Sequence, residues 1–311
     1  MELRNDTSVK IFVLLGFSHL PQYRLTLISL FISLYIFTFL GNILIILLII
    51  KDRQLHNPMY FLLANFSVID LLSSSVSVPK MIADLFSREG FITFSTCVTQ
   101  MFFFIAMTIT ECFFLSVMAF DRYVAICIPL HYKKIMSNKM CITLTCGAWL
   151  VGCFQSVIHT VLTNKLVFCG PNQINHFFCD IISLSHLACS PAFLNLAMVC
   201  VSTFFDGICN FSVIISSYIG IVSTIVKIKS NDGKVKAFCT CASHLLVVVL
   251  YYGTLVIAYF RPLSSYSDSK DRTIAVIYTT VTPALNPIIY SLRNNDVKKA
   301  LKKIIFKGST S

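Results

Sequence analysis

Seven stretches of the chain are apolar over roughly the 20 residues that a helix needs to cross a bilayer. They lie at residues 25–50, 58–79, 97–120, 141–162, 193–226, 237–260 and 273–292. Four contain no Asp, Glu, Lys or Arg, and the other three contain one acid each: Asp70, Glu111 and Asp206. Hydrophobic residues make up 56% of the chain and charged residues only 13%, a composition that excludes a soluble globular protein. The sequence predicts an all-α membrane protein, a bundle of seven transmembrane helices.

Basic residues gather in alternate connections between these spans. The segments 51–57, 121–140, 227–236 and 293–311 hold sixteen of the 25 Lys and Arg residues but only four of the 14 acids. Positive charge in short loops marks the cytosolic side of a membrane protein. We therefore expect an extracellular N-terminus and a cytoplasmic C-terminus. The net charge of +11 then reflects topology and contact with membrane lipids, and no nucleic acid partner is expected.

No repeat, composition shift or low-complexity tract divides the chain, so we expect one domain over residues 1–311. It comprises an extracellular segment 1–24, the helical bundle 25–292 and a cytoplasmic tail 293–311. The apolar patch 11–17 is not followed by a small-residue cleavage site, so no cleaved signal peptide is expected. In the tail, Asn294 and Asp296 offer a helix start. Apolar residues then recur every three to four positions opposite lysines, which predicts a short amphipathic eighth helix on the inner leaflet: Val297, Ala300, Leu301, Ile304 and Ile305.

The predicted orientation gives two covalent sites on the outer side. Asn5 begins an Asn-Asp-Thr glycosylation acceptor, whereas the acceptors at Asn65 and Asn210 lie inside spans. Four of the 13 cysteines fall on the outer side: Cys97, Cys169, Cys179 and Cys189. They allow three pairings, and we expect at least one disulfide to tie the long loop 163–192 to the start of the third span.

The chain carries no catalytic signature. HExxH, GxSxG, GxxxxGK[ST] and GxGxxG are all missing from the sequence, and the seven histidines show no metal-ligand spacing. We expect no enzymatic activity. A transporter remains an alternative because of the intramembrane acids, although no repeated half is visible.

Five short motifs follow one another along the chain: LHNPMYFLL (55–63), MAFDRYVAICIPLHY (118–132), SY (217–218), KAFCTCASHL (236–245) and PALNPIIYSLRN (283–294). In this order and at matching membrane depths, they resemble the signature stretches of vertebrate olfactory receptors, a family of class A G-protein-coupled receptors. Ile128 and Cys239 depart from the family pattern, and both lie near the expected G-protein face. The cysteine pattern is also similar, and by the resemblance we expect the pairs Cys97–Cys179 and Cys169–Cys189.

The resemblance assigns a conformational switch to the inner end of the bundle. Asp121 and Arg122 are expected to form an ion pair between neighbouring residues that restrains the inactive state. The alternative is that Arg122 only anchors its helix at the membrane surface. The remaining switch residues are Tyr123, Tyr218, Asn286, Pro287 and Tyr290. Pro287 removes a helical hydrogen bond and should kink the seventh helix.

A polar cluster is expected in the middle of the membrane, where an isolated charge costs several kcal/mol. Asp70 and Glu111 should meet Asn42 and Asn286 there. The resemblance implies an allosteric sodium ion at Asp70 and Glu111 and no other cofactor. The alternative is a protonated, hydrogen-bonded network without a cation.

The ligand site is expected in the outer half of the bundle, with mostly apolar walls and a few hydroxyl groups. Its candidate residues are Met101, Phe104, Ile105, Thr108, Ser202, Thr203, Asp206, Tyr251, Tyr252, Val276 and Thr279. Such walls suit a small hydrophobic molecule with one polar group. Asp206 could bind an alcohol or an amine, or it could belong to a structural network.

The expected function is therefore an odorant receptor in the plasma membrane that activates a stimulatory olfactory-type G protein and raises cyclic AMP. A receptor of the same fold for another small ligand is the first alternative.

Overall fold

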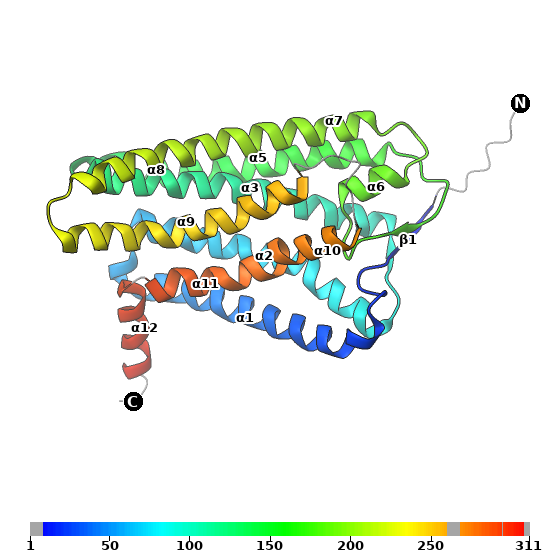
Figure 1. Ribbon diagram of the computed structural model, residues 1–311, viewed down its shortest axis with the longest axis horizontal. Helices are drawn as coiled ribbons and strands as arrows, with labels where there is room; N and C mark the ends of the chain where they lie inside the picture. The colour runs from blue at the N-terminus through cyan, green and yellow to red at the C-terminus, as the bar shows by residue number, and fades with distance from the viewer. Residues whose placement is uncertain (1–8, 260–267, 294, 308–311) are drawn as a thin grey trace, which may run out of the picture.

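Long, roughly parallel helices form a bundle that is elongated along the helix axes (Figure 1). The computed structural model describes residues 9–259, 268–293 and 295–307. Asn5 and Asn294 lie outside the described residues, and the side chains of Cys239, Ile304 and Ile305 are not described either.

Seven helical segments run the length of the bundle in the described part of the chain. They are α1 (Arg24–Lys51), α2 (Pro58–Ser87), α3 (Phe94–Cys127), α5 (Asn138–Asn164), the continuous α7, η4 and α8 (Phe193–Ser202, Thr203–Cys209 and Asn210–Lys227), α9 (Asn231–Tyr259), and the continuous α10, η6 and α11 (Asp268–Val276, Ile277–Val281 and Thr282–Arg293). Six are long and apolar enough to cross a membrane, and the apolar part of α9 covers Cys241–Ile257. The protein is a multi-pass membrane protein with the predicted seven-helix fold.

Short elements precede, connect or follow the long helices. They are η1 (Pro21–Tyr23), η2 (Arg53–Leu55), η3 (Pro129–His131), α4 (Tyr132–Ile135), α6 (Ile181–Leu187), the final helix α12 (Asn295–Lys307), and the strands β1 (Ile11–Leu14), β2 (Phe91–Thr93) and β3 (Gln173–Ile174). We call the end of the bundle that carries β1 the N-terminal end and the end that carries α12 the basic end.

Local sequence explains where several helices begin. The side chains of Asn57, Thr93 and Ser137 accept hydrogen bonds from the first turns of α2, α3 and α5, at 3.3 Å in each case. Such caps satisfy backbone N–H groups that have no partner within the helix. Helix α2 ends where Arg88 adopts a left-handed conformation, with φ 62°.

Two helices are longer than their apolar windows suggested. Helix α2 continues through Pro79 to Ser87, whereas the predicted span stops at residue 79. Its extension is supported by an ion pair one turn apart between Lys80 and Asp84. Helix α3 runs to Cys127, so Asp121 and Arg122 lie inside its last turns.

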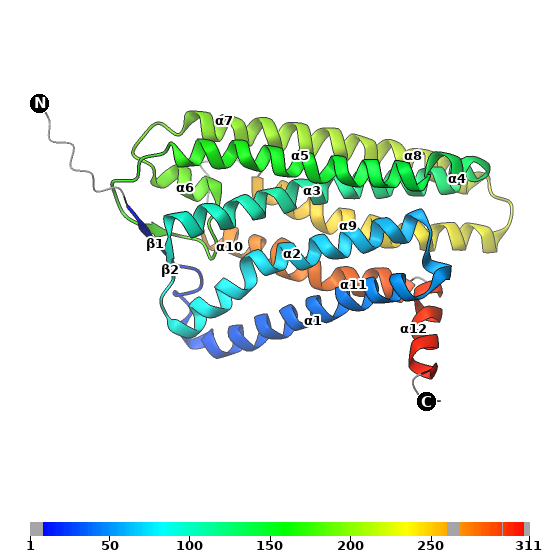
Figure 2. The ribbon, with the colours of Figure 1, turned by 180° about the vertical axis from the view of Figure 1, so that it is seen from behind.

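Helix α3 is the central element of the bundle, in contact with α2, α5, α8 and α9. In its most apolar window 72% of the residues are buried, against 17% for Phe193–Lys227. The view from behind shows α3 between α5 and α2, with α1 at the edge of the bundle (Figure 2). Side chains on α3 therefore face several helices at once, and the segment from α7 to α8 turns much of its surface toward the bilayer.

The N-terminal segment forms a small sheet with two loops, a feature that the sequence did not reveal. Strand β1 pairs antiparallel with β2 and parallel with β3. Phe12 and Ile174 of this sheet are completely buried. The apolar patch 11–17 thus begins a folded cover over the N-terminal end.

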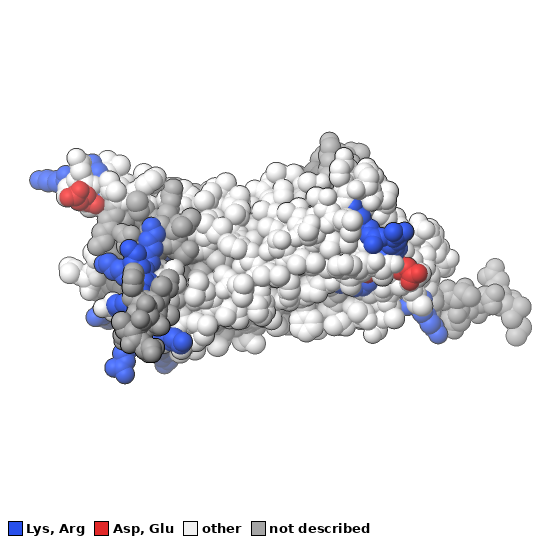
Figure 3. Space-filling model, turned by 90° about the horizontal axis from the view of Figure 1, so that it is seen from below, with Lys and Arg blue, Asp and Glu red and all other residues white. Residues whose placement is uncertain are grey.

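Helix α12 confirms the predicted amphipathic helix and lies across the basic end of the bundle (Figure 1). Val297 and Ala300 are buried, while Lys298, Lys299, Lys302 and Lys303 are exposed. Lys303 pairs with Asp52 at 3.1 Å. In the space-filling view, Lys and Arg gather at this end, and a broad band without charged side chains separates it from the other end (Figure 3).

Candidate functional site

A cavity of about 750 Å³ lies among α3, α5, the α7 to α8 segment and α9. Seven of the eleven predicted ligand residues line it: Phe104, Ile105, Thr108, Ser202, Thr203, Asp206 and Tyr252. Most of the other wall residues are aliphatic or aromatic, among them Ile109, Val199, Ile214 and Val248. The volume and the apolar walls match those of a small-molecule pocket.

The other four predicted residues lie outside the cavity lining. Met101 is fully buried and accepts a weak hydrogen bond from Thr163 of α5. Tyr251 donates its hydroxyl hydrogen to the backbone oxygen of Thr108 at 2.7 Å. Val276 directly precedes a π-helical segment, η6, and Thr279 lies inside it and donates to the backbone oxygen of Ala275. A π turn shifts the faces that follow it, which explains why regular helical spacing misplaces residues on the seventh span.

A second π-helical segment presents Asp206 to the cavity. Asp206 lies in η4 and is 7% exposed. One carboxylate oxygen accepts a hydrogen bond from the Gln155 amide at 2.9 Å. The other oxygen is buried and has no hydrogen-bond partner among the described protein atoms. It can accept a hydrogen bond from a molecule in the cavity.

Two polar residues of α5 belong to the site. They were not predicted from the sequence, because the span that contains them has no charged residue. They are Gln155, which holds Asp206, and His159, whose ring nitrogen Nε2 lies 3.1 Å from the Ser202 hydroxyl. Both are uncharged residues in the otherwise apolar span 141–162. The signal that could have found them is polarity in the middle of an apolar span, because such a group needs a partner there.

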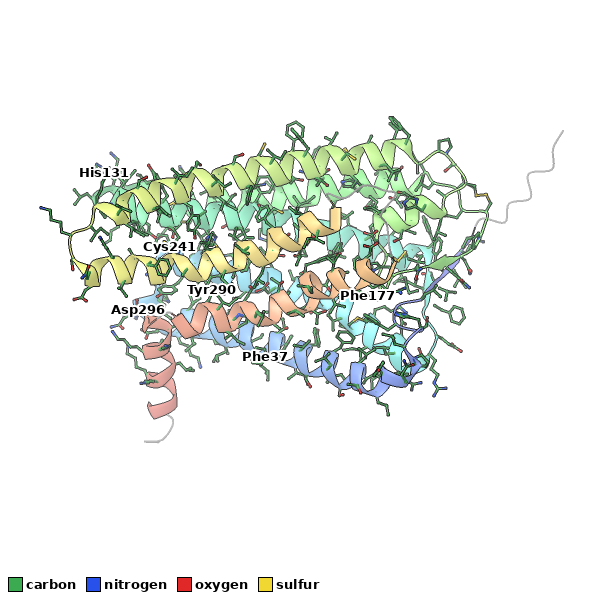
Figure 4. All side chains as sticks on the ribbon, viewed as in Figure 1. Phe37, His131, Phe177, Cys241, Tyr290 and Asp296 are labelled. Carbon is green, nitrogen blue, oxygen red and sulfur yellow. A yellow bond between two sulfur atoms is a disulfide. The ribbon has the colours of Figure 1, made fainter. Side chains whose placement is uncertain are left out.

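An aromatic layer closes the N-terminal side of the cavity. The Phe104 ring packs against Phe178 of the loop and Tyr278 of η6, with centroids 4.5 and 6.0 Å apart. Phe177, in the same layer, lies at the N-terminal end of the molecule (Figure 4). Ile181 of α6 lines the cavity directly.

Both predicted disulfides are present. Cys97 at the start of α3 bonds to Cys179, and Cys169 bonds to Cys189 within the loop. The first bond fixes the residue after Phe178, so the loop covers the end of the cavity with little freedom to move away.

The predicted polar cluster forms beside α3. The Asn286 amide donates to both carboxylate oxygens of Asp70, at 2.9 and 3.1 Å. Asn42 donates to the backbone oxygens of Thr38 and Pro283. The side-chain oxygens of Asn42 and Asn286 are buried without a hydrogen-bond partner among the described protein atoms.

These groups have the chemistry of a site for a hard cation. Glu111 is buried and interacts electrostatically with Asp70, so two carboxyl groups lie near two amide oxygens. Oxygen ligands of this type suit hard cations. The described residues include no group of three or more His, Cys, Asp and Glu side chains placed to hold a metal ion. A cation here would depend on the amide oxygens as well as the acids.

The expected ion pair between Asp121 and Arg122 is absent from the described salt bridges, so that prediction is wrong for this conformation. Asp121 instead accepts a hydrogen bond from the Tyr132 hydroxyl at 2.8 Å, and Arg122 contacts the Met59 sulfur. Adjacent helix positions face different directions, which separates the two side chains. Burial, followed by the charge of Asp121, raises the pKa of Tyr132, so this phenol keeps the hydrogen it donates.

A chain of hydrogen bonds joins three helices nearby. The Tyr218 hydroxyl of α8 bonds to His244 of α9 at 2.9 Å, and His244 bonds to the backbone oxygen of Leu115 in α3 at 3.1 Å. Cys241, one turn from His244, and Tyr290 both lie toward the basic end (Figure 4). His244 was not among the predicted switch residues, although it lies within one of the quoted motifs.

The other predicted switch residues lie at close helix contacts. Tyr123 packs so tightly against Gly220 that a Cβ atom there would lie 2.5 Å from its ring. Pro287, inside α11, approaches Gly41 of α1 in the same way, at 2.9 Å. Tyr290 is buried, and its ring packs edge-on against Phe66 at 6.1 Å. Tyr123 of α3 is therefore in tight contact with α8, and α11 is in contact with both α1 and α2.

A bundle of seven long helices, with an apolar, ligand-sized cavity among α3, α5, the α7 to α8 segment and α9, is the architecture of a seven-helix membrane receptor. The sequence profile of the olfactory receptor family matches residues 31–308. The chain belongs to this family, whose members are odorant-sensing G-protein-coupled receptors and not enzymes.

Relatives match over nearly their whole length. Olfactory receptor 1G1 of Gorilla gorilla gorilla is 47% identical, covering 98% of both chains. Olfactory receptor 1A1 of Homo sapiens is 46% identical over 100% of both, and olfactory receptor 5AR1 of Mus musculus is 44% identical over 99% of both.

Proposed function

We propose that this receptor binds a small, mostly apolar odorant carrying one hydrogen-bond donor in the cavity beside Asp206. The observation that carries the proposal is the unpartnered carboxylate oxygen of Asp206 in an apolar wall. A buried acceptor without a partner costs about 1–3 kcal/mol, and an alcohol or amine group would remove that cost. A ketone cannot donate a hydrogen bond and would gain nothing there.

The direction of signalling follows from the charge distribution. Lys and Arg gather at the basic end, which supports a cytoplasmic position for that end and the C-terminus and an extracellular position for the N-terminus. The partner at the basic end is a stimulatory olfactory-type heterotrimeric G protein, and its activation raises cyclic AMP. Ligand and G protein each favour the same conformation, so each strengthens the binding of the other.

The switch residues act on this conformation. Arg122 is 7% exposed in the described conformation and interacts electrostatically with Tyr218 and Tyr290. Separation of the basic ends of α8 and α9 would release Tyr218 from His244 and open space at Arg122 for the G protein. A sodium ion at Asp70, Glu111, Asn42 and Asn286 would favour the closed conformation.

The test is cyclic AMP output from cells that express the receptor with an olfactory-type G protein, across alcohols, amines, ketones and acids. Wild type, Arg122→Ala and Asp206→Asn are compared at equal surface amounts. The proposal expects a dose-dependent response to alcohols or amines that Arg122→Ala abolishes and that Asp206→Asn weakens about tenfold, the effect of about 1.4 kcal/mol.

Gln155→Leu serves as the matched control, because it removes the partner of Asp206 and leaves the carboxylate in place. A response to ketones that Asp206→Asn leaves intact would contradict the hydrogen-bond role of Asp206. Flux of substrate across the membrane without nucleotide exchange on a G protein would instead favour a transporter.

A further inference from the structure

The cavity wall continues into the outer surface of the bundle between α8 and α9. Seven of its lining residues are 41–60% exposed: Ile208, Phe211, Ile215, Leu245, Val249, Val256 and Ile257. All seven are apolar and lie within membrane-crossing helices, so their exposed faces contact lipid hydrocarbon. Other lining residues, such as Phe104, Cys112 and Ile214, are at most 5% exposed. The cavity therefore runs from the interior of the bundle to its lipid-facing surface.

The described cover at the N-terminal end is tightly packed by comparison. Phe12 and Ile174 of the sheet and Phe177, Phe178 and Cys179 of the loop are 0% exposed. The two disulfides and the pairing of β1 with β2 and β3 hold this cover together. Among the described residues, a passage through this end would require the sheet or the loop to move.

The opening between α8 and α9 has one aromatic contact, with a small residue next to it on each helix. Phe211 of α8 and Tyr252 of α9 approach each other with ring centroids 5.3 Å apart. The next residues on each helix, Ser212 and Gly253, also line the cavity, and a Cβ atom at Gly253 would meet nothing within 4 Å. The space beside Gly253 is open, and Ser212 and Gly253 are small residues among the larger apolar side chains that border it.

We propose that the odorant reaches the cavity from the bilayer, through a lateral opening between α8 and α9 bordered by Ser212 and Gly253. The inference rests on the proposed function, since it concerns the ligand of the same cavity. An apolar molecule is already concentrated in the membrane, because each methylene group enriches it in hydrocarbon roughly fourfold. The lateral opening draws on this concentrated pool, and specificity is exerted afterwards at Asp206.

The experiment uses the full receptor in lipid nanodiscs and a nine-carbon linear alcohol that carries an aliphatic diazirine. The probe is added to the membrane, irradiated after different times, and the labelled peptides are identified by mass spectrometry. Labelling of residues 104–112 on α3 reports arrival in the interior. It needs no G protein, so it remains informative even if the odorant panel gives no cyclic AMP response.

Two variants plug the opening from opposite sides, Ser212→Phe and Gly253→Phe. Each has a control on a lipid-facing helix surface outside the cavity lining: Ser216→Phe on the same helix as Ser212, and Gly147→Phe, where a Cβ atom also meets nothing within 4 Å. We expect both plugs to slow labelling of residues 104–112 about tenfold, with the final extent unchanged, and both controls to match wild type.

Three outcomes would overturn the proposal. Plugged variants that label at the wild-type rate would show that the probe arrives by another route. A reduced final extent with an unchanged rate would show that the new rings occupy the binding space itself. Labelling confined to residues 208–215 and 249–257 in wild type would show that the opening holds lipid chains and leads no ligand inward. Retained cyclic AMP responses in any of these cases would leave the proposed function standing.

Discussion

The imidazole of His244 lies parallel to the phenol ring of Tyr218, with 7° between the ring planes and 5.9 Å between their centroids. The Leu115 backbone oxygen can only accept a hydrogen bond, so Nε2 of His244 carries the hydrogen and Nδ1 accepts from the Tyr218 hydroxyl. The same hydroxyl hydrogen is shared with the Cys241 backbone oxygen, which accepts it at 3.1 Å. The pair ties α8 to α9, and through Leu115 to α3, at the contact that would open in the proposed activation.

Replacing His244 with Phe keeps a ring but removes both hydrogen bonds. The Tyr218 hydroxyl can still donate to the Cys241 backbone oxygen, so the net loss is about one hydrogen bond. One net hydrogen bond is worth about 1 kcal/mol, which shifts a two-state population about fivefold. We expect basal cyclic AMP to rise about fivefold in His244→Phe without odorant. The control is His131→Phe, at an exposed site near the same end. Unchanged basal output at equal surface amounts would show that this contact does not restrain the receptor.

Gly152 of α5 allows a close approach to α3. A Cβ atom there would lie 2.3 Å from the Thr110 hydroxyl oxygen and 2.7 Å from the Ala106 backbone oxygen. Gly152→Ala must separate the two helices, and we expect a loss of about 1–3 kcal/mol in the free energy of unfolding. Thermal unfolding of the purified receptor measures it. Gly147→Ala, on the same helix with open space around it, should unfold at or slightly above the wild-type temperature, because alanine favours a helix more than glycine does. An equal loss in both variants would show that the close contact at Gly152 is not the cause.

Sodium should act through the cluster around Asp70. We expect replacement of sodium by N-methylglucamine at constant ionic strength to raise basal nucleotide exchange in the wild type. Asp70→Asn removes the charge beside Asn286 and should abolish the difference between the two salts. Asp52→Asn, which alters an acid in the loop that pairs with Lys303, is the control. Equal sodium sensitivity in wild type and Asp70→Asn would favour a hydrogen-bonded network without a cation.

Acid should destabilise the cover at the N-terminal end through His176. Burial and then the charge of Arg272 lower the pKa of His176 from 6.5 to about 3, so the folded receptor holds this ring neutral. The unfolded chain takes up a proton below pH 6.5, and stability falls by about 1.4 kcal/mol per pH unit from there toward pH 3. Between pH 7 and pH 5 we expect a loss of about 2 kcal/mol, read from thermal unfolding.

The control for this pH effect is His176→Gln, which cannot titrate. Its unfolding temperature should change less between pH 7 and pH 5 than that of the wild type. Asp180 is also buried, and its raised pKa acts in the opposite direction, but it is common to both proteins. An identical pH dependence in the two proteins would refute the role of His176.

The two disulfides should differ in their contribution to stability. Cys97 and Cys179 are 82 residues apart, whereas Cys169 and Cys189 are 20 apart. A longer closed loop restrains the unfolded chain more, by about 1 kcal/mol for this difference in loop length. The double alanine variant of the first pair should therefore unfold at a lower temperature than that of the second. Equal unfolding temperatures would mean that loop length does not set the difference.

The sequence predicted the elements that are determined by the residues of one continuous segment. Apolar stretches of membrane length located all seven spans, and the three-to-four spacing of Val297, Ala300 and Leu301 located α12. Helix ends were predicted less well: the second apolar stretch ends at residue 79, whereas α2 continues to Ser87.

The cavity required information that regular spacing cannot supply. The π segments η4 and η6 change the helix faces around Asp206 and Thr279, and nothing in the apolar pattern marks them. The partners Gln155, His159 and His244 are uncharged, so they did not stand out, yet each is defined by a neighbour on another helix. Contacts between distant segments were the missing information.

Strand β1 has a consequence for the biosynthesis of the receptor. Ile11 accepts a hydrogen bond from Asn172, a residue made 161 positions later. The ribosome has therefore completed α1, α2, α3 and α5 before the last strand of this sheet exists, and until then β1 has only β2 to pair with. The pairing of β1 with β3 joins the start of the described chain to its middle, and until it forms, Phe12 and its neighbours lack part of the cover that buries them in the folded receptor.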